Sequence, residues 1–316
     1  MHVTILSRGE TIHSTRRLVE AARALGHRTR VLDPLLLQMG LGAGPPFILA
    51  DEKPVPRTDV VIPRIAQSIN TYGLALVNQY DFAGTPVLND ATSIAQARNK
   101  MRLMQLLARS GLPVPPTVIG RGANELRRMV AHVGGLPVAI KIIEGPEKSG
   151  VIICESAQAL EASLQAVLSM GHNIIVQRYV KPGEGRDLRA LVVGGEVLAA
   201  VRRHPDRGKL RHTLGTGKRV TRVRLTAEER HIALQSAHVV GLEVAAVDML
   251  DLKVGGTRVF DVHSSPGLRD LEAATGADLA TPIVQRALEL ARTRRALAAM
   301  SPRPGRSRRP PSGSPA

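Results

Sequence analysis

The first third of the chain alternates short apolar runs with longer segments in which apolar residues recur at helical spacing. One of the helical segments ends at Gly26, a residue type that commonly follows the last turn of a helix. Strands are expected at residues 3–6, 30–32, 60–62 and 87–88, and helices at residues 16–25 and 70–82. This alternation is typical of a parallel sheet with crossover helices. Residues 1–95 are therefore predicted to form a small N-terminal α/β domain.

The next segment is strongly amphipathic. Its spacing predicts a single helix over residues 94–109, with Met104 and Leu107 on one face. Three prolines within residues 113–116 then mark a boundary. Beyond it, strands are expected at residues 118–119, 138–143, 151–154 and 174–177, with a glycine-bearing turn after the second of them. Residues 96–180 are therefore predicted to contain the linking helix and a small second domain.

Paired glycines organise the last part of the chain. Hairpins are expected where residues 188–193 and 196–203 flank one Gly-Gly pair, and where residues 244–250 and 258–262 flank another. Thr226, followed three residues later by Glu229, predicts a capping box at the start of a helix that reaches about Val240. Residues 181–299 are predicted to form a larger third domain. Residues 300–316 contain few apolar groups and are predicted to be a disordered basic tail.

Composition narrows the class of protein. A chain of 316 residues can bury a sizeable core, and its only cysteine, Cys154, has no partner for an intrachain disulfide. The apolar run at the start of the sequence is too short for a signal peptide. No stretch approaches the roughly 20 apolar residues that are needed to cross a bilayer. The protein is therefore expected to be soluble and cytoplasmic, with no membrane partner. The net charge of +16 favours an anionic partner, although an arginine-rich composition is an equal explanation.

Two lysines are candidates for phosphate binding. Lys141 lies inside an apolar strand, where a charged group needs either solvent or an anionic partner. The turn that follows it contains Lys148 and could place backbone N–H groups over phosphates. Lys100, on the preceding helix, is the second candidate. The alternative for each is an ordinary solvated lysine.

Two aspartates are candidates for metal binding. Asp248 and Asp261 lie on adjacent predicted strands joined by a Gly-Gly hairpin, so both carboxylates can face the same side at a spacing suited to Mg²⁺. A carboxylate within an apolar strand is costly unless it is paired or binds a metal. Salt bridges to the many arginines are the alternative.

Several literal strings occur in the same order as these features. They are Ile-Leu-Ser-Arg at 5–8, Leu-Asp-Pro at 32–34, Val-Ile-Pro-Arg-Ile at 61–65, Ala-Arg-Asn-Lys-Met-Arg-Leu-Met-Gln-Leu-Leu-Ala-Arg at 97–109, Val-Gln-Arg-Tyr-Val at 176–180, Asp-Leu-Arg-Ala-Leu-Val-Val-Gly at 187–194 and Ser-Pro-Gly-Leu at 265–268. Over residues 1 to about 295 the chain resembles the RimK family of ATP-grasp carboxylate-amine ligases. The resemblance implies an α/β (α+β) class with an ATP-grasp fold and an N-terminal pre-ATP-grasp domain.

The resemblance also implies roles for particular residues. ATP phosphates would contact Lys100, Lys141 and Lys148. The adenine hinge and nearby nucleotide contacts would be Gln177, Arg178, Tyr179 and Asp187. Arg211 would face the phosphate and acyl region, while Asp248, Asp261 and His263 would hold Mg²⁺ or Mn²⁺. Arg64, Arg202 and Arg203 are plausible clamps for substrate carboxylates, because a guanidinium fork matches a carboxylate.

The implied reaction adds glutamate, through an acyl phosphate, to the C-terminal carboxylate of a ribosomal protein or related acidic peptide. Related proteins suggest a homotetramer, and the basic tail suggests a weak RNA contact. Some positions depart from the family pattern: Pro146 in the loop, Arg178 in place of an acid, Asp261 in place of Glu, and His263 and Thr213 in place of Asn. Two functions therefore stay open, an active ligase and a non-catalytic protein that binds nucleotide or a ribosomal partner. An RNA-binding accessory protein is a third, disfavoured because stacking aromatics are scarce.

Overall fold

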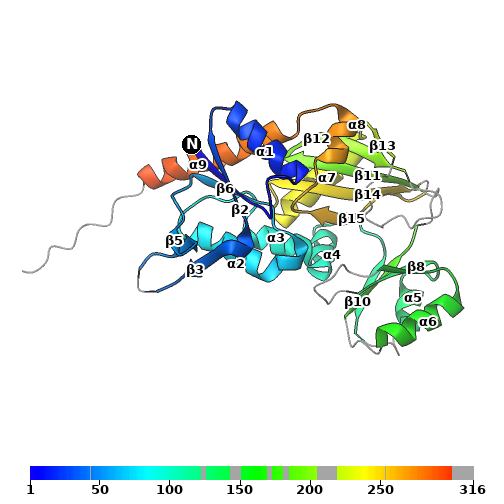
Figure 1. The fold of residues 1–316 in the computed structure, drawn as a ribbon. Coiled ribbons are helices and arrows are strands. Elements are labelled where there is room, and N and C mark those ends of the chain that lie inside the picture. The colour runs from blue at the N-terminus through cyan, green and yellow to red at the C-terminus, as the bar shows by residue number, and fades with distance from the viewer. Residues whose placement is uncertain are drawn as a thin grey trace, which may run out of the picture.

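Figure 1 shows the computed structural model of the chain. The described residues are 1–42, 44–121, 126–142, 151–168, 173–180, 185–204, 219–252 and 254–300. The predictions for the turn that contains Pro146 and Lys148, for Arg211 and Thr213, and for the tail beyond residue 300 lie outside these ranges. Within the described part of the chain, no helix combines the length and the apolar composition that a membrane span requires.

The N-terminal sheet is parallel, as the alternating pattern predicted. Its order is β2-β1-β6, with strands β1 (His2–Leu6), β2 (Arg28–Leu32) and β6 (Val60–Pro63), and with helices α1 (His13–Ala24) and α2 (Asn70–Phe82). The expected strand at residues 87–88 makes only an isolated parallel bridge, between Val87 and Val61. No sequence pattern predicted the additional antiparallel sheet of β3 (Leu37–Gly40), β4 (Phe47–Ala50) and β5 (Lys53–Pro54), or the short 3₁₀ turns η1 (Pro34–Leu36) and η2 (Gln67–Ile69).

The single helix predicted over residues 94–109 is wrong, because two helices occupy this region. α3 (Ala91–Arg98) ends at Asn99, whose backbone is extended with φ −77° and ψ 98°. The Asn99 side chain accepts a hydrogen bond at 3.1 Å from the backbone N–H of Arg102 and so caps α4 (Lys100–Arg109). The break makes Lys100 the first residue of α4 instead of a residue in a helix interior.

The large sheet is antiparallel, with the order β13-β12-β11-β14-β15. Its strands are β11 (Gly185–Val193), β12 (Glu196–Arg203), β13 (Val220–Arg222), β14 (Val244–Leu252) and β15 (Gly256–His263). Both predicted hairpins are confirmed. The predicted capping box is confirmed too, since Thr226 and Glu229 exchange hydrogen bonds at the start of α7 (Ala227–Val240). Helices α7 and α4 cover the sheet face that carries Leu188 and Val247, and α8 (Arg269–Thr275) follows β15.

The small sheet forms a separate lobe below the large sheet in Figure 1. Its order is β7-β10-β8-β9, with strands β7 (Thr117–Gly120), β8 (Val138–Ile142), β9 (Val151–Cys154) and β10 (Ile174–Arg178), and with helices α5 (Leu126–His132) and α6 (Ala157–Leu168). Ile140 and Val176 pack in an apolar cluster with residues of α5. Because side chains alternate along a strand, Lys141 and Gln177 lie on the other face.

The C-terminal helix α9 (Ala280–Met300) packs against the N-terminal sheet. It contacts α1 and β6, and its buried residues Ile283 and Leu288 share one apolar cluster with Val3 of β1. Leu191 of β11 belongs to the same cluster. The first strand, the last helix and the large sheet therefore share a core. The predicted domain boundaries stay predictions.

The shared core gives a stability prediction. Leu288 is 3% exposed, so Leu288→Ala leaves a cavity between α9 and the N-terminal sheet. We expect it to lower the free energy of unfolding by about 2–5 kcal/mol, measured by urea denaturation. The matched control is Leu297→Ala on the same helix, because Leu297 is 59% exposed and its loss should cost less than about 0.5 kcal/mol. Equal losses in the two variants would contradict the burial of α9 against the sheet.

Candidate functional site

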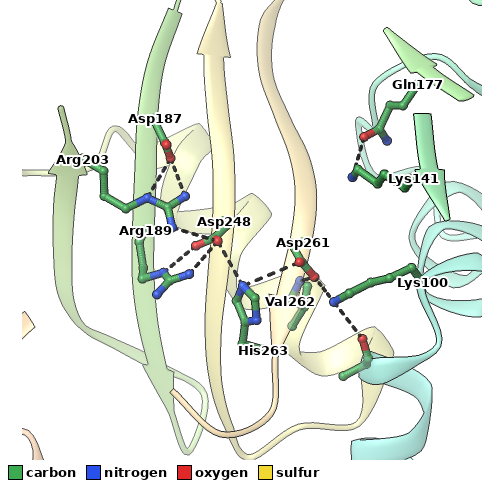
Figure 2. A network of polar contacts seen from close by, with 11 residues as sticks. Lys100, Lys141, Gln177, Asp187, Arg189, Arg203, Asp248, Asp261, Val262 and His263 are labelled. Atoms are coloured by element: carbon green, nitrogen blue, oxygen red, sulfur yellow. Dashed lines mark hydrogen bonds and ion pairs between the residues drawn. The ribbon is translucent and has the colours of Figure 1, made fainter. Parts of the chain in front are cut away.

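One face of the large sheet carries a row of charged side chains. The strand register places Asp248 of β14 directly opposite Arg189 of β11 on one side and Asp261 of β15 on the other. Asp187 lies opposite Arg203 of β12 in the next row. Residues two apart on a strand share a face, so these groups line one surface (Figure 2). The glycine hairpin thus places the two aspartates side by side, as the sequence pattern predicted.

Asp248 is surrounded by cations. Arg189 donates to both of its oxygens, from Nε at 2.6 Å and from Nη2 at 2.7 Å. Arg203 Nη1 donates at 3.0 Å, and His263 Nε2 lies at 3.1 Å. Burial alone would raise the pKa of Asp248, but the arginines and His263 hold it well below its ordinary value. The carboxylate is therefore ionised at neutral pH, and both of its oxygens accept hydrogen bonds from the protein.

Arg203 joins two carboxylates. It also donates to Asp187 Oδ1, from Nε at 3.0 Å. Burial opposes its charge, but Asp248 and Asp187 outweigh that effect and raise the pKa of Arg203 above its ordinary value. Arg203 is thus part of the charged row and is held between the two acids.

Arg202 faces the other way. In the register it lies opposite Leu188, which packs in the apolar cluster under α7. Consecutive residues on a strand point to opposite faces, so Arg202 and Arg203 cannot present their side chains to the same site while β12 keeps this register. The structure therefore does not bring Arg202 together with the other predicted residues.

Asp261 connects the large sheet to α4. Lys100 Nζ makes an ion pair with Asp261 Oδ1, and the backbone N–H of Val262 donates to the same oxygen at 2.7 Å. His263 Nε2 lies 3.6 Å from the other oxygen. Burial would raise the pKa of Asp261, but Lys100 and His263 outweigh it and lower the pKa. The break at Asn99 matters here because it directs the first side chain of α4 to the β15 edge.

Lys141 approaches from the small sheet. Its Nζ donates to Gln177 Oε1 at 2.9 Å across β8 and β10. Burial lowers the pKa of Lys141, while Asp261 raises it and Lys100 lowers it further. Both influences require these charges to be close, and Figure 2 shows the two lysines on the same side of β15. The structure therefore brings Lys100, Lys141 and Asp261 into one region between the sheets.

The predicted hinge divides between two faces. Gln177 and Tyr179 are 4% and 5% exposed. Arg178 is exposed, and its Nη1 donates to the carbonyl oxygen of Gly134 at 2.7 Å. Strand alternation places the Arg178 side chain on the helix-covered face, away from Lys141. On the sheet face that carries Lys141, Arg178 can therefore contribute only backbone atoms to a site.

Arg64 lies at the carboxyl end of β6. Its Nη2 donates to the carbonyl oxygen of Pro266 at 2.7 Å, and burial lowers its pKa to about 10. Among the described residues no carboxylate forms an ion pair with it, so a largely desolvated guanidinium retains donors for an anion. Arg64 has no contact with the charged row in the described part of the chain.

The charged row contains two carboxylates that fit Mg²⁺. Asp248 and Asp261 offer the hard oxygen ligands that Mg²⁺ prefers, and this ion is commonly held by one or two carboxylates together with substrate phosphates. The imidazole of His263 is a poor ligand for it. The described ranges contain no ready-made group of three or more His, Cys, Asp or Glu side chains placed to hold a metal. The two aspartates therefore fit, provided that Mg²⁺ displaces some of their present partners.

Two residues of this region were missed from the sequence. Arg189 stands two positions after Asp187, and strand alternation alone would have placed it on the same face. Thr117 accepts a hydrogen bond from Gln177 Nε2 at 2.9 Å. No sequence signal marks Thr117, because Gln177 comes from a strand far away in the chain.

Comparisons with known proteins cover almost the whole chain. Residues 1–94 match the RimK PreATP-grasp domain, and residues 97–287 match the RimK-like ATP-grasp domain. A probable alpha-L-glutamate ligase of Marinomonas sp. (strain MWYL1) is 40% identical over 285 residues, which cover 90% of this chain and 94% of that protein.

Solved structures resemble the same fold. The ATP-grasp ligase PsnB in complex with a minimal precursor has a TM-score of 0.73 at 23% identity, over 92% of this chain and 98% of that one. PsnB with a phosphomimetic variant of the minimal precursor, Mg and ADP has a TM-score of 0.72 at 22% identity, over 92% and 98% of the two chains. The expected ATP-grasp fold with an N-terminal pre-ATP-grasp domain is confirmed.

Proposed function

Because this chain belongs to the RimK family of ATP-grasp proteins, we propose that it is an ATP-dependent carboxylate-amine ligase. The single observation that carries the proposal is the convergence of Lys100 and Lys141 beside the paired acids Asp248 and Asp261. In this region cations outnumber carboxylates by one, which favours an anionic ligand such as a triphosphate bound together with Mg²⁺. The cations are Lys100, Lys141, Arg189 and Arg203, and the carboxylates are Asp187, Asp248 and Asp261.

The chemistry explains why such a site needs cations. A substrate carboxylate oxygen attacks the γ-phosphorus of ATP, and the bond to the β-phosphate oxygen breaks, so that ADP leaves and an acyl phosphate forms. The attacking group and the phosphate are both anionic, and Lys100 and Lys141 lower the barrier by neutralising charge between them. An amine then attacks the acyl carbon, phosphate leaves, and the amine nitrogen loses a proton. Mg²⁺ held by Asp248 and Asp261 would supply further charge neutralisation at the phosphates.

The proposed substrates are glutamate, as the amine, and the C-terminal carboxylate of a ribosomal protein or related acidic peptide. The name of the Marinomonas relative supports glutamate, and the precursor complex of PsnB supports a peptide. Arg64 supports an anionic substrate in addition to ATP, because its guanidinium has no carboxylate partner among the described residues. A planar guanidinium binds a carboxylate through two parallel hydrogen bonds.

An incorporation assay tests the proposal. The protein is mixed with ATP, Mg²⁺, labelled glutamate and a peptide with an acidic C-terminus. We expect one ADP released for each glutamyl residue that mass spectrometry finds on the peptide. The matched control is the same peptide with a C-terminal amide, which lacks the reacting carboxylate. Labelling of both peptides to the same extent would contradict a C-terminal acceptor, and no labelling of any acceptor would contradict the ligase.

One specific observation favours a non-catalytic protein as the second candidate. The Asp248 carboxylate already accepts from Arg189 and Arg203 and contacts His263, so both of its oxygens have cationic partners with which a metal would have to compete. A protein of this kind binds nucleotide or a ribosomal partner without forming an amide. Tight ADP binding without glutamate incorporation would favour it. We favour the ligase because both lysines and both acids are present together.

Four further predictions accompany the ligase. ATP and glutamate are cytoplasmic metabolites, so a cytoplasmic location is consistent with the proposal. A homotetramer is predicted from the family resemblance. A weak RNA contact through residues 300–316 is predicted from their arginines, and it would fall steeply as salt concentration rises. Mg²⁺ is the proposed metal ion, with Mn²⁺ as the alternative, because the hard oxygen ligands of the two acids suit both ions.

A further inference from the structure

A chain of hydrogen bonds leads from the segment before the small sheet to Lys141. The Thr117 hydroxyl donates to the carbonyl oxygen of Pro115 at 2.7 Å. Gln177 Nε2 donates to the Thr117 oxygen at 2.9 Å, and Lys141 Nζ donates to Gln177 Oε1 at 2.9 Å. Thr117, Gln177 and Lys141 come from three neighbouring strands, β7, β10 and β8. The chain therefore crosses the small sheet on the face that carries the phosphate-directed lysine.

The groups at both ends of this hydrogen-bond chain determine which atoms donate and which accept. The Pro115 carbonyl can only accept, so the Thr117 hydroxyl must donate to it and is left to accept from Gln177. An ammonium group can only donate, so Gln177 must present its carbonyl oxygen to Lys141 and its NH₂ group to Thr117. No alternative assignment of the Gln177 amide satisfies both neighbours. The Thr117 hydroxyl and the Lys141 ammonium thus require the same orientation of the Gln177 amide, and Thr117 holds its NH₂ end in place.

The position of Gln177 makes this orientation costly to lose. Its side chain is 4% exposed, so water cannot replace a missing partner easily. Its Nε2 also lies 3.7 Å from the sulfur of Met104 on α4, the helix that begins with Lys100. Gln177 therefore contacts the element that carries the second phosphate-directed lysine.

The Pro115 carbonyl, where the hydrogen-bond chain starts, belongs to the segment between the two sheets. The Pro113 carbonyl accepts from the backbone N–H of Val259 on β15 at 2.8 Å, and the Pro116 carbonyl accepts from the backbone N–H of Arg178 on β10 at 3.0 Å. Pro115 lies between these bonds, so the carbonyl that orients Thr117 belongs to the segment that joins the sheets. The hydrogen-bond chain ties Lys141 to that segment.

We propose that Thr117 and Gln177 are positioning residues, which orient Lys141 toward the nucleotide phosphates through the hydrogen-bond chain that starts at the Pro115 carbonyl. The inference rests on the proposed function, since it assigns Lys141 to the phosphates. Neither residue touches the reacting atoms in this assignment. Thr117 acts only through Gln177, and Gln177 acts through Lys141.

A double-mutant cycle with ADP as the probe tests the chain. Thr117→Val keeps the shape of the side chain but removes the hydroxyl, so the Gln177 NH₂ group loses the acceptor that holds the amide in place beside Lys141. We expect the Kd for ADP with Mg²⁺, measured by calorimetry, to rise by up to about tenfold, the upper end of the range for one neutral hydrogen bond. Thr117→Ser keeps the hydroxyl and should restore the affinity to within about twofold. In a Lys141→Met background, Thr117→Val should change the Kd by less than about twofold.

A nucleotide-free measurement separates this inference from the proposed function. The ammonium protons of Lys141 should exchange slowly enough to be seen in ¹⁵N-lysine spectra of the wild type and of Thr117→Ser. They should disappear in Thr117→Val, and Lys141→Met assigns the signal. An equal loss of ADP affinity in both backgrounds, or an unchanged ammonium signal in Thr117→Val, would overturn the hydrogen-bond chain. Failure of the wild type to bind ADP, with the predicted changes in the spectra, would overturn only the proposed function.

Discussion

Lys141→Met is expected to slow ligation by roughly 100-fold or more, the scale seen when one preorganised donor to developing charge is removed. The methionine keeps an unbranched stem of similar length but cannot neutralise a phosphate. The measurement is the rate of ADP release coupled to glutamate incorporation. The folded protein should keep its stability, because removing a charge that burial disfavours offsets the loss of the hydrogen bond to Gln177 Oε1. Loss of activity with an unchanged or raised melting temperature is the expected signature.

The control for this variant is Lys53→Met. Lys53 is an exposed residue of β5, in the antiparallel sheet of the N-terminal region. The Lys53→Met variant therefore makes the same side-chain change at a position away from the charged row. The activity of Lys53→Met should stay within about twofold of the wild-type activity, and its melting temperature within a few degrees. A Lys141→Met protein that ligates at a rate similar to that of the wild type would remove the central support of the proposed function.

Asp248→Asn is expected to cause the largest loss of stability among these polar variants. The side chain is 4% exposed and holds Arg189 through two hydrogen bonds and Arg203 through one. A neutral amide leaves the arginines facing a group with one acceptor oxygen and two donor hydrogens. Breaking a buried ion pair by removing one partner typically costs about 3–5 kcal/mol, which urea denaturation at about pH 7 would measure. Activity should be lost too, because Asp248 is one of the two proposed magnesium ligands.

The pH dependence of this loss has a definite sign. The pKa of Asp248 in the folded protein lies well below its ordinary value of 3.8, so the carboxylate stabilises the fold above that value. This stabilisation is lost only as the pH falls through the lowered pKa of the folded state. The difference between the wild type and Asp248→Asn should therefore be constant near neutrality and shrink below about pH 4.

A surface ion pair provides the comparison for Asp248. Asp81 pairs with Arg294 at 3.3 Å, but the two side chains are 42% and 50% exposed. Asp81→Asn should therefore cost less than about 1 kcal/mol, because solvent screens an exposed pair. A stability loss for Asp248→Asn no larger than that of Asp81→Asn would show that the arginines find other partners, and the charged row would then not act as one network.

Much of the site could be predicted where the controlling interactions are local. Strand alternation places Lys141 on the sheet face opposite that of Ile140, and the Gly-Gly hairpin sets Asp248 opposite Asp261. Thr226 and Glu229 form their capping box within a single helical turn. The helix break at Asn99 is also local, but the amphipathic pattern continued through it and hid it. A capping side chain competes there with continued helix, and the sequence pattern alone did not show which would prevail.

The sequence by itself determined many of the helices and strands, the parallel character of the first sheet and the family, because these depend on periodicity, turn residues and literal strings. Only the tertiary structure decided that α9 packs on β6, that Arg189 binds Asp248, and that Thr117 orients Gln177. Each of these contacts joins residues at least 59 positions apart in the chain. Which distant segments meet depends on how all the apolar faces are buried together, and no window of sequence contains that information.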